Sequence, residues 1–212
     1  PSQSDYFQST RGGGNGDYYV IVLAPSSVQE MADFMDLAFT LAFKYRMPAM
    51  ILSDGVIGQM MEKVVLPPVK PRRTEEEIKK ECPWATFGRT PDRKPNIITS
   101  LELQPEVMEI RNQKLLKKYE LVKENEVRYE TSQCEDADYL FVAFGSAARI
   151  SEKAMELARE AGLKVGLFRP ITLWPFPEKQ LEALAKGKKG VLSVEINAGQ
   201  MVEDVRLATH GT

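Results

Sequence analysis

The glycine-rich run RGGGNG, from Arg11 to Gly16, is the part of the chain whose composition most directly suggests ligand chemistry. Consecutive backbone N–H groups in such a run can cradle an anion such as a phosphate. A dinucleotide-binding fingerprint, however, follows a strand and opens a helix, whereas these glycines precede an apolar run, and no Gly-Lys-Ser/Thr sequence follows them. This context favours a flexible loop, with a direct ligand contact as the alternative.

Two further short motifs stand where predicted strands end. Gly145-Ser146 has the strand-to-helix position of a phosphate-binding turn but lacks the second and third glycines, so we expect a tight turn with Ser146 as the helix N-cap. Asp54 follows a short apolar run and precedes Gly55. Its carboxylate could bind or cap another group, or the Asp-Gly pair could be an ordinary turn. Both interpretations of Asp54 stay open.

The sequence gives little support for a catalytic nucleophile or a metal site. The only histidine, His210, lies near the end of the chain, where no Ser–His–Asp or Cys–His arrangement can be built around it. Cys82 and Cys134 are far apart and have no CxxC spacing, which excludes a zinc site or an iron–sulfur cluster made by this chain alone. We therefore predict no catalytic residue and no metal ligand, and we expect reduced cytosolic thiols.

Aromatic and polar residues follow the later apolar runs. Trp174 lies in the sequence WPFP, which is typical of a rigid apolar wedge under a loop. A second interpretation makes Trp174 and Phe176 anchors of a protein interface, since tryptophan is enriched at binding hot spots. For Glu195 and Asn197, capping of a helix that starts near Gly199 is favoured over contact with a ligand or partner.

The charge balance and the apolar runs narrow the class of protein. The chain has 28 Lys and Arg against 30 Asp and Glu, a net charge of −2, so we expect neither nucleic acid nor an anionic membrane surface as a partner. No apolar run approaches the ~20 residues of a membrane span, and the N-terminus lacks signal-peptide features. We expect a cytoplasmic protein. Because Pro1 opens within a polar loop and the last helix has no following strand, we expect an excised fragment.

The first block of the chain has a strand–helix–strand pattern. A strand is predicted over Tyr18–Leu23, and a second over Ala49–Leu52. Between them, Ser27 and Glu30 form the pattern of a capping box that opens an amphipathic helix, and Pro48 ends it. The two strands should be parallel, which places the loops after them at the ligand-facing edge of the sheet.

A connector and a second alternating block follow. Proline, charge and turn residues fill 67–104, and Pro105–Tyr129 has a helical pattern, so we expect a long helix that joins two domains. The second block alternates strands and helices, and we expect these elements: a strand Ala137–Phe144, a helix Ala147–Ala161, a strand Lys164–Phe168, a helix Pro177–Lys186, a strand Val191–Ile196 and a helix Met201–Ala208.

Three segments together carry a family resemblance. They are GLFRPITLWPFP at Gly166–Pro177, VLSVEINAGQMVEDVRLA at Val191–Ala208, and the run from Ala24 to Glu62 that begins APSSVQEMADFMDLAF. The chain resembles the alpha subunit of 2-oxoacid:ferredoxin oxidoreductases, in particular the 2-oxoisovalerate and 2-oxoglutarate types. The resemblance implies an α/β fold: residues 1–66 as the C-terminal part of a pyrimidine-binding (thiamine diphosphate) domain, 67–130 as a linker with a long helix, and 131–212 as a transketolase C-terminal-like α/β/α domain with a mostly parallel sheet, truncated at its end.

The resemblance also implies how the functional groups are distributed between this chain and other subunits. The N-terminal PSQSDYFQ and GGGNGD match a family segment that follows the active-site loop, which makes a set of site-edge candidates: Ser4, Asp5, Gln8, Arg11, Gly14, Asn15 and Asp54. A glutamate that activates the cofactor would lie upstream of Pro1. A beta subunit would hold the thiamine diphosphate phosphates and magnesium, and gamma and ferredoxin-like delta subunits would carry iron–sulfur clusters. No cofactor is expected on this chain alone.

The reaction implied is oxidative decarboxylation of a 2-oxo acid to an acyl-CoA, with coenzyme A as co-substrate and electrons passing to ferredoxin. The branched-chain type is favoured by PSQSDYFQSTRGGGNGD, and the isolated chain should be inactive. Two alternatives remain: a non-catalytic platform for subunit assembly, and the beta chain of a lipoamide-linked 2-oxoacid dehydrogenase.

Overall fold

The computed structural model describes residues 2–14, 16–89 and 91–211. Residues 1–66 and 117–212 form one compact unit, and residues 67–116 form a second. The division into domains 1–66, 67–130 and 131–212 stays a prediction.

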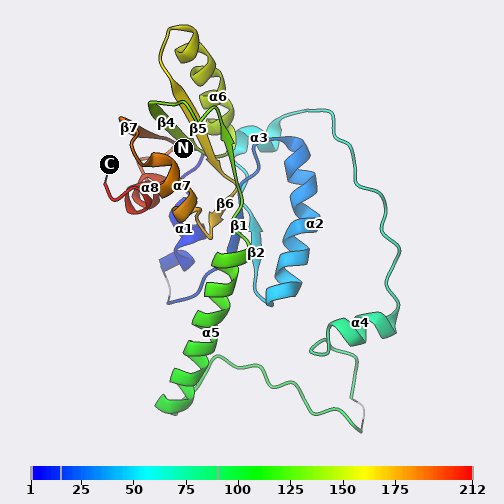
Figure 1. Cartoon of the computed structure of the whole chain (residues 1–212). Coiled ribbons are helices and arrows are strands. Elements are labelled where there is room, and N and C mark those ends of the chain that lie inside the picture. Colours follow the sequence, from blue (N-terminus) through cyan, green and yellow to red (C-terminus); the bar gives the residue numbers. More distant parts are fainter. Residues whose placement is uncertain (1, 15, 90, 212) are drawn as a thin grey trace. The chain divides into compact units, whose positions relative to one another are not determined.

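The strand–helix–strand pattern of the first block is confirmed. Strand β1 (Ile21–Leu23) leads into helix α2 (Val28–Tyr45) and then into strand β2 (Ala49–Ile51), as Figure 1 shows. The two strands are parallel, with Ile21 opposite Ala49. Strand β1 is shorter than the predicted Tyr18–Leu23 because Tyr18 is exposed and only the segment from Ile21 is fully buried.

The start of α2 differs in one detail from the predicted capping box. Ser27 is the N-cap, and its hydroxyl accepts a hydrogen bond from the Glu30 N–H at 3.1 Å. The Glu30 carboxylate does not return to Ser27 but accepts from the Ser26 N–H at 2.7 Å. The helix ends at Tyr45, and its C-cap Arg46, two residues before Pro48, has a left-handed φ of 48°.

A third strand of the first sheet comes from the second block. Strand β6 (Thr172–Trp174) pairs antiparallel with β1, so the order of the sheet is β2-β1-β6. The sequence pattern predicts no strand here, because a three-residue strand between prolines is too short to be distinguished from a turn. The expected apolar wedge is not contradicted, since Trp174 is buried.

The second sheet is mostly parallel, as predicted. Strand β4 (Tyr139–Ala143) pairs parallel with β5 (Val165–Pro170) and with β7 (Gly190–Val194). The edge strand β3 (Tyr129–Ser132) pairs antiparallel with β5, and the order is β3-β5-β4-β7. This strand was missed, because the predicted helix to Tyr129 ends earlier: α5 covers Pro105–Asn125. The α/β class is confirmed.

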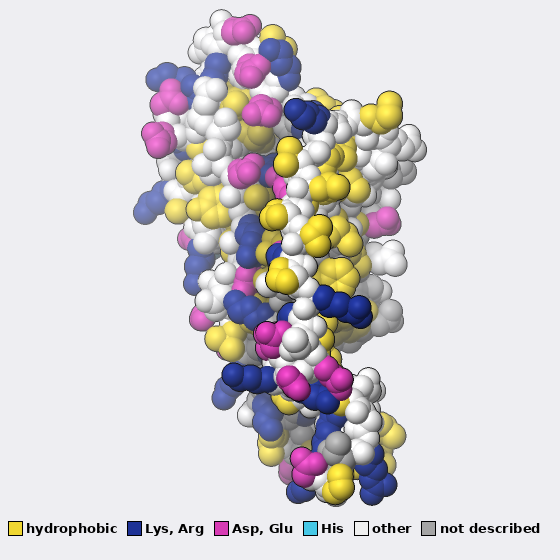
Figure 2. All heavy atoms as spheres, turned by 90° about the vertical axis from the view of Figure 1, so that its right-hand side faces the viewer, with side chains coloured by type: hydrophobic (Ala, Val, Ile, Leu, Met, Phe, Trp, Pro, Cys, Tyr) yellow, Lys and Arg dark blue, Asp and Glu magenta, His cyan; other side chains and the backbone are white. Residues whose placement is uncertain are grey.

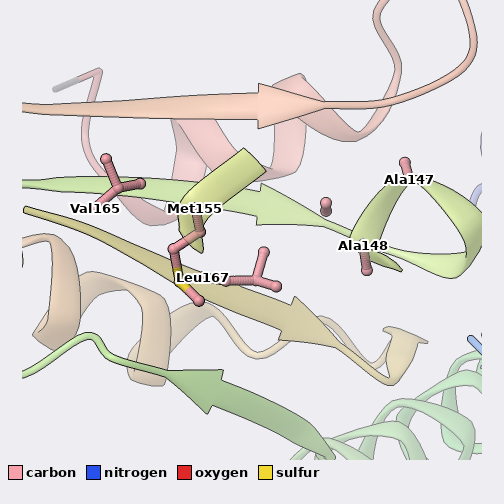
Figure 3. Close-up of a cluster of buried hydrophobic side chains, with 6 residues drawn as sticks. Ala147, Ala148, Met155, Val165 and Leu167 are labelled. Atoms are coloured by element: carbon pink, nitrogen blue, oxygen red, sulfur yellow. The ribbon is translucent and has the colours of Figure 1, made fainter. Parts of the chain in front are cut away.

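The remaining elements of this unit include three helices that connect the strands of the second sheet or follow it. They are α6 (Gly145–Glu160), α7 (Glu178–Ala185) and α8 (Met201–Ala208). Figure 3 shows how α6 lies on the sheet: Met155 reaches toward Val165 and Leu167, while Ala147 and Ala148 lie at the start of the helix. These side chains are buried, so the beginning of α6 is held in place by the core.

Short elements complete the description. Helix α1 (Tyr6–Thr10) and the 3₁₀ turn Gly12–Gly14 precede β1, and α3 (Gly55–Gln59) follows β2. In residues 67–116, α4 (Glu75–Glu81) has a capping box made by Thr74 and Glu77. Nearly all described side chains of that unit are exposed or half-buried.

Helix α2 presents an apolar stripe to solvent. Met35, Phe39 and Phe43 recur every four residues and are 52%, 62% and 46% exposed. Figure 2 shows hydrophobic side chains gathered on the side of the molecule where α2 lies. Exposed apolar patches of this kind mark protein contacts more often than free surface. Within the described residues, no helix has both the length and the apolar character that a membrane crossing requires.

Candidate functional site

The carboxyl ends of β2, β4 and β7 meet at one place, and the N-terminal segment 2–5 lies across them. We call this place the strand-end joint and define it by Gln3, Asp54, Gly145, Ser146 and Ile196. Gln3 and Asp54 are 5% and 6% exposed. In α/β proteins this edge of a sheet is where ligands bind, so the joint is the place at which the candidate site must be built.

Asp54 is the charged centre of the strand-end joint. Its Oδ1 accepts from the N–H groups of Val56 and Ile57 at 3.2 and 3.1 Å, which caps α3. Its Oδ2 accepts from the Ser146 N–H at 2.7 Å, at the start of α6. Burial by itself would raise the pKa of Asp54, but the hydrogen bonds outweigh burial and the pKa lies below its usual value. Asp54 is therefore more than a turn former: it stabilises the N-termini of two helices.

Gly145 and Ser146 do not form the predicted cap. Phe144 is the residue at the N-cap of α6, and the Ser146 hydroxyl is buried without a hydrogen-bond partner among the described residues. The helix is capped by Asp54 from a distant segment, which sequence reasoning could not see. Gly145 has φ +57°, and a Cβ there would lie 2.6 Å from Asp54 Oδ2. Glycine is thus required for both its backbone angle and the close approach of the carboxylate.

Glu195 and Asn197 follow β7 and confirm the capping prediction. Glu195 Oε2 accepts from the N–H groups of Gln200 and Met201 at 3.1 and 2.8 Å, and Oε1 accepts from Val202 at 3.1 Å. Asn197 Oδ1 accepts from the Gly199 N–H at 2.8 Å. The carboxylate thus satisfies the free N–H groups at the start of α8.

A second polar cluster lies between α1 and α8. Arg11 makes a two-pronged ion pair with Asp204, at 2.9 and 3.2 Å, and the Tyr6 hydroxyl donates to Asp204 Oδ2 at 2.5 Å. Burial, followed by the adjacent Asp204 carboxylate, raises the pKa of Tyr6 well above its usual value. The guanidinium of Arg11 is thereby committed to a partner within the chain, and Tyr6 stays protonated.

The other site-edge candidates lie on the same N-terminal segment. Ser4 and Asp5 are exposed, with Asp5 at the N-cap of α1 and the Ser4 carbonyl accepting from Gln200 Nε2 at 2.8 Å. Gln8 is exposed and borders an open hollow of about 520 Å³. Gly14 ends the 3₁₀ turn, and Asn15 lies outside the described residues. The structure brings Ser4, Asp5, Gln8 and Arg11 onto one segment, while Asp54 is reached through Gln3.

Gly12, in the glycine run, lies close to the segment that precedes β1. Gly12 has φ +60°, and a Cβ at that position would lie 2.7 Å from the Tyr18 carbonyl oxygen. This close approach explains why glycine is needed at Gly12 without invoking a ligand. A ligand contact by the run stays a prediction.

Sequence reasoning missed a contact around a buried arginine, which we call the arginine clasp and define by Ser26, Glu30, Glu130 and Arg169. Arg169 is 5% exposed. Its guanidinium donates to Glu30 at 2.5 and 2.9 Å, to Glu130 at 2.8 and 3.1 Å, and to the Ser26 hydroxyl at 2.8 Å. The only available signal was an arginine within an otherwise apolar strand. The clasp borders a cleft of about 340 Å³.

The two predicted interface anchors are mostly covered by this chain itself. Trp174 is 6% exposed and stacks on Tyr19, with ring centroids 4.8 Å apart, while Tyr119 meets it edge-on at 5.6 Å. Phe176 is 8% exposed. Both border a cleft of about 570 Å³ between β6 and the helices α5, α7 and α8. Their role as anchors for another chain stays a prediction.

The charged groups around the strand-end joint are engaged within the chain. No group of three or more His, Cys, Asp or Glu side chains among them is placed to hold a metal ion. Asp54, the one acidic side chain of the strand-end joint, already accepts from N–H donors, and Arg11 is paired with Asp204. Asp54 and Arg11 are thus both engaged within the chain. The strand-end joint holds an N-terminal segment at the carboxyl ends of strands from both sheets.

Comparison with known families covers nearly the whole chain. Residues 1–131 match the family described as pyruvate flavodoxin/ferredoxin oxidoreductase, thiamine diphosphate-binding. Residues 137–212 match pyruvate:ferredoxin oxidoreductase core domain II.

Individual relatives agree with these matches. The chain is 46% identical, over 99% of its length, to ketoisovalerate oxidoreductase subunit VorB of Methanothermobacter marburgensis. It is 37% identical, over 96% of its length, to 2-oxoglutarate synthase subunit KorA of Methanocaldococcus jannaschii. These alignments span 58% and 59% of the two relatives.

A solved structure shows the same fold. The 2-oxoglutarate:ferredoxin oxidoreductase from Magnetococcus marinus, determined with 2-oxoglutarate, coenzyme A and succinyl-CoA bound, superposes with a TM-score of 0.77 at 26% identity. The match covers 98% of this chain and 40% of that chain.

Proposed function

Because the chain belongs to the 2-oxoacid:ferredoxin oxidoreductase family, we propose that it forms part of the subunit that binds the pyrimidine end of thiamine diphosphate in such an enzyme. The observation that carries this proposal is the 46% identity to a ketoisovalerate oxidoreductase subunit over 99% of the chain. The enzyme would decarboxylate a 2-oxo acid oxidatively, transfer the acyl group to coenzyme A and pass electrons to ferredoxin.

The substrate we propose is a branched-chain 2-oxo acid. Two ketoisovalerate oxidoreductase subunits are 46% and 44% identical to the chain, against 37% for a 2-oxoglutarate synthase subunit. 2-Oxoglutarate is the second candidate, because the solved relative binds 2-oxoglutarate and coenzyme A. The two substrates differ by a carboxylate, so a pocket for the branched-chain acid should be apolar where a pocket for 2-oxoglutarate needs a cation.

Partner subunits are part of the proposal. A beta subunit would hold the diphosphate and its Mg²⁺. Gamma and delta subunits would carry the iron–sulfur clusters, and the two cysteines of this chain are free and buried. The apolar stripe of Met35, Phe39 and Phe43 offers a surface for a neighbouring subunit.

The chemistry would be divided accordingly. Thiamine diphosphate, when bound, supplies the electron sink for decarboxylation. This chain would contribute a fixed scaffold: the strand-end joint orients the segment Ser4–Arg11, and the core under α6 keeps that joint rigid. Such precise placement by packed elements is what a pre-organised site requires.

The test is an assay of the full-length gene product, purified mildly with its partners from its native host. Viologen reduction that depends on 2-oxoisovalerate, with bound thiamine diphosphate and iron, is the expected result. Reduction that depends only on 2-oxoglutarate would assign the second substrate. Activity that requires lipoamide, in a complex that purifies without iron, would favour the lipoamide-linked dehydrogenase. A homo-oligomer without cofactor would favour the assembly platform.

A further inference from the structure

We propose that Gln3 is a positioning residue, which holds the N-terminal segment Ser4–Arg11 at the carboxyl ends of three strands. The functional part of this inference rests on the proposed function, whereas its structural part does not. Gln3 was not among the residues that the sequence singled out. The structure identifies it because one buried side chain contacts the ends of strands from both sheets.

The Gln3 amide is fully committed to the chain around it. Its Nε2 donates to the Phe144 carbonyl at 2.9 Å, after β4, and to Asp54 Oδ2 at 3.3 Å, after β2. Its Oε1 accepts from the Ile196 N–H at 2.9 Å, after β7. A primary amide has two N–H donors and one carbonyl acceptor, so these three contacts use every polar atom of the side chain.

Backbone contacts place the same residue in register with β7. The Gln3 N–H donates to the Ile196 carbonyl at 3.2 Å, and the Gln3 carbonyl accepts from Asn197 Nδ2 at 2.9 Å. The segment therefore continues the hydrogen bonding of the β7 end as far as Gln3. Beyond Gln3, its attachment changes to side-chain contacts with α8.

Glutamine suits this position because of the charge beside it. Asp54 is buried and ionised, so the atom that faces it must be a donor, while the Ile196 N–H needs an acceptor on the same group. Glutamate has the same shape but would set a second carboxylate 3.3 Å from Asp54. Gly145 completes the fit, since a Cβ there would lie 2.9 Å from Gln3 Nε2.

The far end of the segment has its own anchor. The Phe7 N–H donates to Gln200 Oε1 at 2.8 Å, and Tyr6 and Arg11 bind Asp204 on α8. The exposed residues Ser4, Asp5 and Gln8 lie between Gln3 and these contacts. Loss of the Gln3 anchor should release the near end while the far end stays bound. Gln3 would thus control where the predicted site-edge residues stand.

Hydrogen exchange on the full chain tests the structural part. The Ile196 amide is the direct probe, because its acceptor is the Gln3 side chain. In Gln3→Glu at neutral pH, protection of Ile196 and of residues 3–7 should fall about tenfold or more, since several buried bonds are lost together. Protection in the core strands β4 and β5 should not change.

The pH dependence separates positioning from mere packing. Burial and the Asp54 charge would raise the pKa of a glutamate at position 3, so its protonated form, which can donate to Asp54, is favoured in the folded state. Protection should therefore be present at low pH and lost as the pH rises through that raised pKa. Gln3→Met, which keeps the volume but no polar atom, should lose protection at every pH.

The control is Gln59→Glu, which adds the same charge at an exposed position of α3. It should leave Ile196 protection and its pH profile unchanged. Unchanged protection in Gln3→Glu, or a loss equal to that of the control, would overturn the positioning role. A loss without recovery at low pH would also overturn it.

The functional part is tested in the assembled enzyme. Gln3→Glu should lower kcat/KM for the 2-oxo acid about tenfold at neutral pH, with recovery toward wild type at low pH and unchanged subunit assembly. Full activity of Gln3→Glu despite a released segment would overturn the link to the reaction. A wild-type complex with no 2-oxo acid-dependent activity would refute the proposed function instead, and hydrogen exchange would still decide the role of Gln3.

Discussion

The strand-end joint and the arginine clasp both tie residues 1–66 to residues of the second block, but they handle buried charge differently. In the joint, the single carboxylate of Asp54 is satisfied by backbone N–H groups and an amide, at 2.7 to 3.3 Å. In the clasp, the guanidinium of Arg169 faces two carboxylates, of which the Glu130 side chain is 62% exposed and that of Glu30 is 22% exposed.

This difference predicts which kind of substitution should disrupt each contact. A carboxylate surrounded by fixed dipoles depends on close geometry, so small changes of shape should disrupt the joint. An arginine between two carboxylates depends on its own charge and fork-shaped head, so changes of chemistry should disrupt the clasp. The following substitutions separate these two modes.

Arg169→Met should have the largest effect. It leaves Glu30 half-buried without its partner, and loss of one member of a buried pair costs about 3–5 kcal/mol. The free energy of unfolding is measured by urea denaturation. Arg169→Lys keeps the charge but not the two-pronged contact, so it should recover only part of the loss. Equal stability of Arg169→Lys and wild type would show that the clasp needs charge alone.

Gly145→Ala should have the second-largest effect on the free energy of unfolding, because the added methyl group does not fit. The added Cβ would lie 2.6 Å from Asp54 Oδ2, and φ is +57°. A left-handed angle costs about 1–2 kcal/mol and overpacking about 1–3 kcal/mol, so the free energy of unfolding should fall by about 2–5 kcal/mol. Gly58→Ala is the control, because a Cβ there meets nothing within 4 Å. A loss in Gly58→Ala as large as that in Gly145→Ala would contradict the steric argument.

The contribution of Asp54 to the free energy of unfolding should be smaller than these effects, and it should change gradually with pH. The hydrogen bonds to Asp54 outweigh burial and hold its pKa below the usual value. Its stabilisation is therefore fully present above its unfolded pKa, and it is lost as the pH falls through the lower folded value. The measurement is the difference in unfolding free energy between wild type and Asp54→Asn as pH falls below about 4. A difference that does not shrink would show that charge is irrelevant to the joint.

The smallest effect is expected outside both contacts. Arg149 pairs with Glu62 at 2.5 Å near the clasp, but the two side chains are 41% and 24% exposed. Such pairs contribute about 0–1 kcal/mol and weaken with salt. Arg149→Ala should therefore change the unfolding free energy little, and less at high salt. A loss as large as that of Arg169→Met would mean that the clasp extends to Arg149.

The sequence predicted most of the regular elements because their patterns are local. The period of α2, Ser27 at its N-cap and Pro48 after its end are read directly from neighbouring residues. The alternation in the second block likewise predicted β4, β5 and β7. The two antiparallel strands β3 and β6 were missed, since β3 is polar and mostly exposed and β6 is three residues long.

The candidate site was less predictable because its contacts are not local. Gln3 contacts Asp54, Phe144 and Ile196, which are 51, 141 and 193 positions away. No spacing rule joins such residues. The same holds for Ser146, whose predicted capping role is taken by a carboxylate 92 positions earlier. Glu195 was predicted correctly because it lies only a few residues from the helix that it caps.

The antiparallel strand β6 has a consequence for the order in which the protein is made. The middle strand of the first sheet, β1, receives its second neighbour only from Thr172–Trp174. About 150 residues must be synthesised in between, which takes roughly 8–30 s on the ribosome. During this time one edge of β1 is open on the nascent chain. We expect this sheet to close late, and we expect variants that delay the arrival of β6 to lower the soluble yield more than their effect on final stability predicts.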